Sequence, residues 1–168
     1  MPSSSLRTSV VEPGAGPPIV GMNAIVKVPG PALAGEVFAF EGMLPPGMFV
    51  PPHTHTHEDE VTVVLDGAIT AAVGDDVVVA TAGAFIIKPR GVPHSFWNHT
   101  DLTARVIEWH TSDTLERYYE QLGSIFASAH DPASTFPRIA AVAADYGITY
   151  HLERIASLVE QHGAPSRP

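Results

Sequence analysis

The sequence of 168 residues contains no cysteine, which excludes disulfides, thiolate metal sites and cysteine nucleophiles together. Any metal site must therefore use nitrogen or oxygen ligands. Basic residues are also scarce, because 9 Lys and Arg stand against 18 Asp and Glu and give a formal net charge of −9. A chain of this charge does not attract a phosphate backbone or an anionic membrane surface, so we expect neither nucleic acid nor membrane among its partners.

Long apolar runs are missing as well. The first 21 residues carry one arginine but no apolar run long enough for a secretory signal, and no later run reaches membrane-spanning length. These absences predict a soluble, cytoplasmic protein, and the length predicts a single domain. Residues 1–18 are rich in Ser, Pro and Gly and predict a flexible N-terminal arm.

Short runs of β-branched and aromatic residues, separated by Gly, Pro and Asp, fill residues 19–112 and predict an all-β sandwich or barrel. The first expected strand covers residues 19–28. Asp66-Gly67 predicts a hairpin between EVTVVL and AITAAV, because both turn residues accept a positive φ, and a second hairpin is expected at residues 74–76.

After His110 the apolar spacing becomes helical. Residues 113–126 predict an amphipathic helix that begins with a capping box of Asp113 and Glu116, and further helices are expected at residues 137–145 and 152–161. We therefore predict a C-terminal extension of two or three α-helices over residues 113–168, packed on the barrel.

The stretch PPHTHTHEDE, residues 51–60, concentrates histidine and acidic side chains. His53 and His55 lie two apart on an expected strand, so both side chains leave the same face and can converge on one atom. Glu60 follows at an odd spacing, so it reaches the same centre only if the chain bends within residues 56–59. His94 follows a Pro-x-Gly turn and opens another short strand, from which we expect it to reach the first pair.

Three imidazoles and one carboxylate suit one divalent transition metal ion. Iron, manganese, nickel, cobalt, copper and zinc all accept such ligands, and a six-coordinate ion would keep two positions open for water, substrate or dioxygen. The ligands bind only when unprotonated, so metal affinity should fall as the pH drops through the imidazole range near ~6.5.

The spacing of these residues resembles the two motifs of the cupin superfamily. The first motif is matched by Gly47, His53, His55, Glu60 and Gly67, and the second by Gly83, Pro89, Gly91, His94 and Asn98. The resemblance implies a jelly-roll β-barrel with His53, His55, Glu60 and His94 as metal ligands. It also implies a homodimer, and the apolar outward positions Val61, Val63 and Leu65 are consistent with a covering neighbour or helix.

Only 15 residues, 68–82, separate the motifs, as in bacterial single-domain cupins, and the order of parts resembles the quercetin dioxygenase-like monocupins. This resemblance implies oxygenative cleavage of a flavonol or another enolisable aromatic or hydroxy-ketone substrate, with Glu60 as the base that accepts the substrate's hydroxyl proton. Two alternatives stay open: a cupin isomerase, epimerase or lyase that uses the metal as a Lewis acid, and a non-catalytic metal-containing small-molecule binding module.

An apolar pocket should surround the ion. We expect substrate contacts from Phe38, Phe40, Phe49, Val64, Phe96 and Glu108. Three neighbours of the ligands receive other assignments: His57 to the surface or the cavity rim, and Glu58 and Asp59 to a solvated bend.

Overall fold

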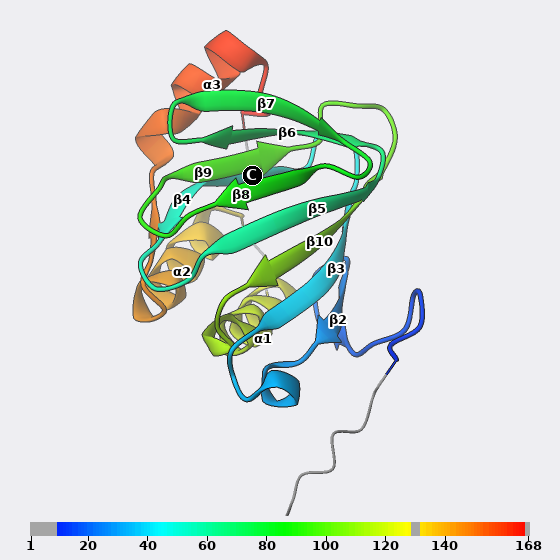
Figure 1. The fold of residues 1–168 in the computed structure, drawn as a ribbon. Coiled ribbons are helices and arrows are strands. Elements are labelled where there is room, and N and C mark those ends of the chain that lie inside the picture. Colours follow the sequence, from blue (N-terminus) through cyan, green and yellow to red (C-terminus); the bar gives the residue numbers. More distant parts are fainter. Residues whose placement is uncertain (1–9, 129–131, 167–168) are drawn as a thin grey trace, which may run out of the picture.

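The computed structural model describes residues 10–128 and 132–166, so the arm predicted at residues 1–18 lies partly outside the described residues. Two antiparallel sheets face each other (Figure 1). The first runs in the order β1 (Pro18–Ile19), β2 (Ala24–Val28), β3 (Phe38–Leu44), β10 (Ala104–His110), β5 (Glu60–Asp66) and β8 (Phe85–Lys88). The second runs in the order β11 (Ile148–Tyr150), β4 (Phe49–His55), β9 (His94–Trp97), β6 (Ala68–Val73) and β7 (Asp76–Thr81). The predicted jelly-roll architecture is confirmed.

Alternation along the strands builds the space between the sheets. In β5, Thr62 and Val64 are fully buried, whereas Val61 and Val63 are half-buried on the outer face, as their parity predicted. Val64 belongs to an apolar cluster contributed by both sheets, which fills one part of the barrel.

Two predictions about the strands are wrong. Residues 19–28 form a small hairpin, in which Ile19 pairs with Ala24, because Gly21 takes a φ of 75° and turns the chain. Asp66-Gly67 is not a hairpin turn either, since β5 and β6 belong to different sheets. Gly67 has a φ of 75°, and a Cβ there would lie 3.1 Å from the Cα of Ala104, so the crossing between sheets needs glycine. The second expected hairpin is confirmed, since Val73 pairs with Asp76.

Helix α1 (Thr114–Ala127) matches its prediction and buries Leu115, Tyr118 and Leu122 against the inner side of β1–β3. The predicted capping box does not form: Asp113 makes no side-chain cap, and the Glu116 carboxylate instead accepts a hydrogen bond from the Gly30 amide at 3.0 Å. Gly30 opens a 3-10 helix, Gly30–Leu33, so Glu116 links α1 to the β2–β3 connection.

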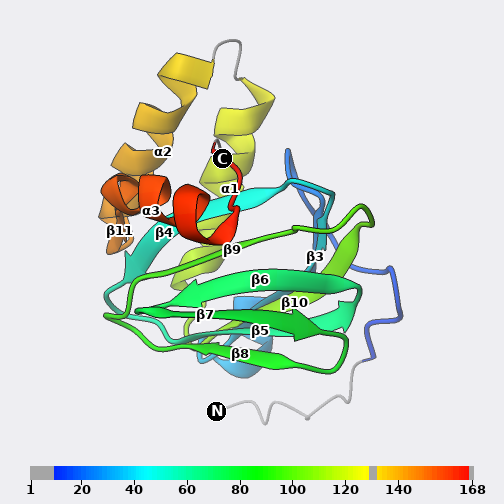
Figure 2. The same ribbon diagram turned by 90° about the horizontal axis from the view of Figure 1, so that it is seen from above.

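Helix α2 (Pro132–Asp145) begins five residues before the start predicted at Pro137, so that boundary is wrong. Pro132 occupies the first position, where its missing N–H would be unpaired anyway, whereas Pro137 is tolerated inside the helix. A short 3-10 helix, Leu152–Arg154, precedes α3 (Ile155–His162). Helices α1 and α2 run side by side away from the sheets (Figure 2). None of the helices in the described residues is both long and apolar enough to cross a membrane.

The predicted extension of two or three helices is confirmed, and a short strand accompanies these helices. Its strand β11 joins the edge of the second sheet and pairs with β4, Ile148 opposite His55 and Tyr150 opposite His53. The extension therefore returns to the strand that carries two of the candidate metal ligands.

Candidate metal centre

The structure brings His53, His55, Glu60 and His94 together, with ligand atoms that all lie within 4.8 Å of one another. His53 and His55 come from β4 and His94 from β9 of the same sheet, where His53 and His94 are direct cross-strand partners. Glu60 opens β5 in the opposite sheet. All four side chains are buried, so the cluster bridges the two sheets inside the barrel.

The bend after β4 explains how Glu60 faces His55 despite the odd spacing. The chain leaves one sheet at His55 and enters the other at Glu60, which places Glu60 Oε2 3.0 Å from His55 Nε2. Two backbone hydrogen bonds hold this bend: the Thr56 amide donates to the Gly147 carbonyl at 2.9 Å, and the Gly91 amide to the His55 carbonyl at 2.8 Å. The bend predicted within residues 56–59 is observed.

Hydrogen bonding assigns the tautomers of two imidazoles. His53 Nδ1–H donates to the Pro51 carbonyl at 2.8 Å and His94 Nδ1–H to the Val92 carbonyl at 3.0 Å, so each Nε2 keeps a lone pair. Yet His94 Nε2 lies 3.2 Å from Glu60 Oε2, which is also an acceptor. Two acceptors at this distance are reconciled by a cation between them.

His55 supports the same interpretation. Both of its ring nitrogens are buried and neither has a hydrogen-bond partner among the described residues. Buried polar atoms are normally hydrogen-bonded, so an unpartnered nitrogen beside a carboxylate is a sign of a ligand position. The donor set of imidazoles and one carboxylate therefore fits a divalent transition metal ion.

Protonation favours metal binding. Burial lowers the pKa of His53 well below its usual value, and burial also lowers the pKa of His94, so both imidazoles stay neutral at pH 7. For Glu60, burial by itself raises the pKa, but the Lys88 ammonium and the neighbouring imidazoles outweigh burial and hold the pKa well below the usual range. Glu60 is consequently a carboxylate anion.

A buried lysine stands behind Glu60. The Lys88 ammonium contacts Glu60 Oε1 and lies 3.0 Å from Glu108 Oε2 and 4.7 Å from the centre of the Phe96 ring. Burial and the neighbouring Glu60 raise the pKa of Glu108 well above its usual value, although Lys88 opposes this shift. Thr62 donates a hydrogen bond to Glu108 at 2.9 Å. The two carboxylates that share one cation thus have pKa values shifted in opposite directions.

A cavity of about 1130 Å³ opens beside the cluster. It is lined by His53, His55 and Glu60 together with the predicted contacts Phe40, Phe49, Phe96 and Glu108. Phe38 and Val64 do not line it, because both lie fully buried in apolar core clusters. The rest of the lining is mainly apolar, and no lysine or arginine of the described residues belongs to it.

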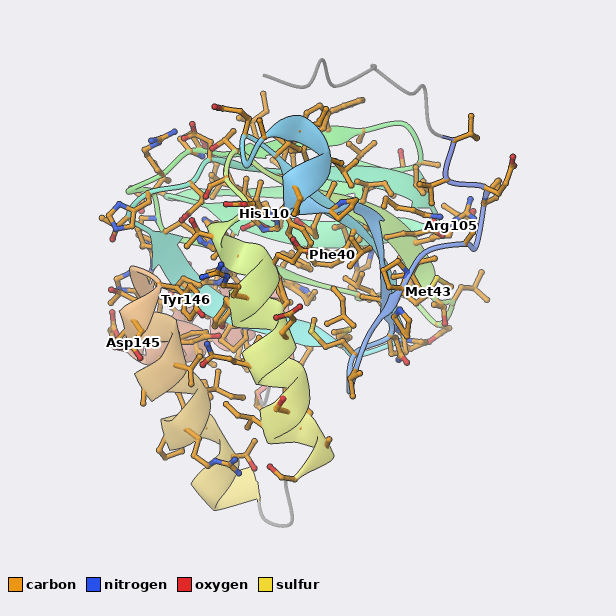
Figure 3. The ribbon with its side chains drawn as sticks, turned by 90° about the horizontal axis from the view of Figure 1, so that it is seen from below. Phe40, Met43, Arg105, His110, Asp145 and Tyr146 are labelled. Atoms are coloured by element: carbon orange, nitrogen blue, oxygen red, sulfur yellow. The ribbon has the colours of Figure 1, made fainter. Side chains whose placement is uncertain are left out.

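The structure adds His110 and Lys88 to the surroundings of the cluster. His110 is fully buried, with Nε2 3.8 Å from Glu60 Oε2 and 3.4 Å from the Tyr119 hydroxyl. Its ring stacks on Phe38 and Phe40 near the first turns of α1 (Figure 3). Strand alternation indicates that both side chains point inward. His110 shares a face of β10 with Glu108, and Lys88 shares a face of β8 with Ile86.

The acidic bend is only partly solvated, so the assignment of Glu58 to solvent is wrong. Glu58 is 1% exposed, with a carboxylate oxygen 3.9 Å from His55 Nδ1, and burial raises its pKa. Asp59 is on the surface and pairs with Arg90 at 2.7 Å. His57 is exposed and lies close to Gly147.

Two facing antiparallel sheets around a buried cluster of three imidazoles and one carboxylate define a jelly-roll barrel with a candidate metal site. The family model of the cupin domain matches residues 40–110, from β3 to the end of β10. This part of the chain is a cupin domain and contains all four candidate ligands.

Solved structures similar to this chain include a predicted oxalate decarboxylase from Thermotoga maritima, with 21% identity, a TM-score of 0.57 and coverage of 62% of this chain and 99% of that one. A salicylate 1,2-dioxygenase from Pseudaminobacter salicylatoxidans has 21% identity and a TM-score of 0.49 over 61% of this chain and 31% of that one. The likeness to the Thermotoga protein shows the fold alone. No curated protein matches the sequence.

Proposed function

We propose that this protein is a metal-dependent dioxygenase that oxygenatively cleaves a flavonol or another enolisable aromatic or hydroxy-ketone substrate. The supporting observation is that a large cavity opens beside the candidate metal centre. The lining of this cavity is mainly apolar and, within the described residues, contains no lysine or arginine. Such a cavity suits a neutral, flat and hydrophobic substrate that presents one or two oxygens to the ion.

A divalent ion held by His53, His55, His94 and Glu60 would supply a Lewis acid for the oxygens of the substrate. Glu60 is the proton acceptor for the substrate's hydroxyl, because it is ionised and lines the cavity. Lys88 engages Glu60 Oε1 and leaves Oε2 on the side of the imidazoles. The raised pKa of Glu108 favours its protonated form.

The isomerase, epimerase or lyase alternative fits less well where it needs a phosphorylated or otherwise anionic substrate. Each nearby cation is already paired with a carboxylate: Lys88 with Glu60, Arg90 with Asp59, and Arg105 with Glu41 at 3.6 Å. A carboxylate or phosphate in the cavity would lie beside the ionised Glu60, and no lysine or arginine of the described residues lines the cavity to offset its charge. A non-catalytic binding module would hold its metal with the same four ligands, so only substrate turnover distinguishes it from an enzyme.

The test is dioxygen consumption by the protein loaded separately with each candidate metal, in the presence of 3-hydroxyflavone. We expect substrate-dependent uptake, loss of at least about 100-fold of the rate in Glu60→Gln, and an unchanged rate in the matched surface variant Glu120→Gln. Flavone turnover without dioxygen uptake would favour the isomerase or lyase, and binding without turnover would favour the module. Either result overturns the dioxygenase.

A further inference from the structure

The C-terminal extension forms one wall of the metal cavity. Tyr118, Tyr119, Ile139 and Tyr150 come from α1, α2 and β11 and line the same cavity as His53. The cupin match ends at residue 110, so this wall is an addition to the cupin domain. A side chain of the extension is therefore able to select among substrates without changing the metal ligands.

Strand β11 fixes this wall to the ligand strand. Tyr150 is the cross-strand partner of His53, and the centres of the two rings are 5.8 Å apart. Next to this pair, the His151 amide donates to the Pro52 carbonyl at 2.8 Å, and His151 Nε2 lies 2.7 Å from the Thr54 hydroxyl. The position of Tyr150 relative to the metal centre is consequently set by a hydrogen-bonded sheet rather than by a loop.

Two phenols on this wall leave one hydrogen-bond donor unused. The hydroxyls of Tyr118 and Tyr150 lie 3.1 Å apart, and each carries one proton. One O–H donates to the other hydroxyl, whose own proton has no acceptor among the described residues. Tyr118 is only 4% exposed, and both side chains line the cavity, so the remaining donor belongs to the cavity wall.

We propose that the Tyr118–Tyr150 hydroxyl pair is a second substrate-binding point, which donates a hydrogen bond to an acceptor oxygen of a substrate whose hydroxy-ketone lies at the metal centre. This inference rests on the proposed function and narrows the substrate class. The substrate is neutral and mostly apolar, and it carries a further oxygen remote from its hydroxy-ketone. An acceptor with a full negative charge is disfavoured, because the cavity lining holds glutamates and no basic residue of the described chain.

The experiment is an anaerobic fluorescence titration of metal-loaded protein with 3-hydroxyflavone and with its 4′-hydroxy and 7-hydroxy derivatives. The wild-type protein should bind at least one derivative about tenfold more tightly than 3-hydroxyflavone, as one added hydrogen bond allows. The double variant Tyr118→Phe/Tyr150→Phe should abolish this preference while keeping the metal content, because either single variant still carries one hydroxyl proton that is free to donate. Tyr146→Phe is the matched control, because the Tyr146 ring packs 5.7 Å from Tyr118 but does not line the cavity.

Equal affinities of the wild-type protein for the three flavones would overturn the inference, as would a preference that survives in the double variant. Loss of metal from the double variant would place the effect at the metal centre and would overturn the inference too. Dioxygen uptake reports separately on the proposed function. A preference that depends on the tyrosines, in a protein that consumes no dioxygen with any of the flavones, would support the second binding point and overturn the dioxygenase.

Discussion

The two ends of the cavity, the metal end around Glu60 and the helical wall formed by the C-terminal extension, differ in the side chains that line them. At the metal end, Lys88, Glu60 and Glu108 lie almost wholly out of solvent and surround the imidazoles with charge. At the helical wall, Leu122 and Ile139 belong to an apolar cluster shared with β1–β3, and phenols supply the polar atoms. The barrel therefore holds the reactive centre, and the extension shapes the space in front of it.

The difference also concerns stability. Burying apolar side chains at the wall stabilises the fold directly, at roughly 25 cal/mol per Å² of apolar surface. Burying charges at the metal end stabilises nothing unless each charge keeps its partner. Removing one partner of an ion pair at the metal end should therefore lower the free energy of unfolding more than removing one partner of an ion pair at the surface.

The largest effect is expected from Lys88→Met, which leaves the Glu60 and Glu108 carboxylates facing each other without a cation. We expect the free energy of unfolding of the metal-free protein to fall by about 3 kcal/mol, the lower end of the range for breaking a buried pair, because Glu108 can keep a proton. Chemical denaturation measures this change. A bound divalent ion should restore part of the loss, since it supplies the missing positive charge.

Arg90→Gln is the matched control for this prediction. Arg90 pairs with Asp59 at 2.7 Å, but the two side chains are 52% and 40% exposed, so solvent screens the pair. The free energy of unfolding should change far less than in Lys88→Met. If both variants lose the same stability, Lys88 is not an essential counter-charge of the metal end.

The next effect is expected at the ligands themselves. His94→Ala should lower metal affinity by about 100-fold or more, because the loss of a direct ligand exceeds the 10–100-fold typical of its outer partners. His99→Ala, a neighbouring exposed histidine bonded to Thr70, should keep the affinity, and so should Leu122→Ala on the helical wall. Metal titration followed by elemental analysis measures all three. Unchanged affinity in His94→Ala would show that the cluster is not a metal site.

The metal end was largely predictable, because its four ligands stand at fixed spacings within two short motifs. His53 and His55 share a face by strand parity, and glycines with φ near 75°, such as Gly67 and Gly91, mark the turns around them. Parity also predicted the outward face of β5. The turn rule failed at Asp66-Gly67, since this turn is the same in sequence whether it closes a hairpin or crosses between sheets.

The helical wall was not predictable from such local rules. Strand β11 has only three residues, too few for an alternating pattern, and its pairing with β4 joins positions about a hundred residues apart. Tyr118 and Tyr119 were recognised as part of an apolar helical face, but no local signal shows that such a face borders a cavity. Burial of Lys88 was equally hidden, because its partners lie on other strands.

The smallest effect is expected in the pH dependence of the free energy of unfolding, which tests how far solvent is excluded from the metal end. Burial lowers the pKa of His110 to about 3, whereas an unfolded histidine titrates near ~6.5. Between pH ~6.5 and about 3, His110 is protonated in the unfolded chain but neutral in the folded chain. The free energy of unfolding therefore falls as the pH drops from 7. His110 alone should remove about 2 kcal/mol by pH 5, at about 1.4 kcal/mol per pH unit. His53 and His94 act in the same direction, and Glu108, whose pKa is raised, acts in the opposite one.

The contribution of His110 is isolated by comparing metal-free wild-type protein with His110→Phe. A phenyl ring suits this position, since the His110 ring already contacts the rings of Phe38, Phe40 and Tyr119. Denaturation at several pH values should give a pH slope flatter by about 1.4 kcal/mol per unit between pH 6 and 4.5 in the variant. Parallel slopes would mean that His110 titrates normally in the folded protein. Water would then reach the metal end as freely as the surface, and the contrast between the two ends of the cavity would be lost.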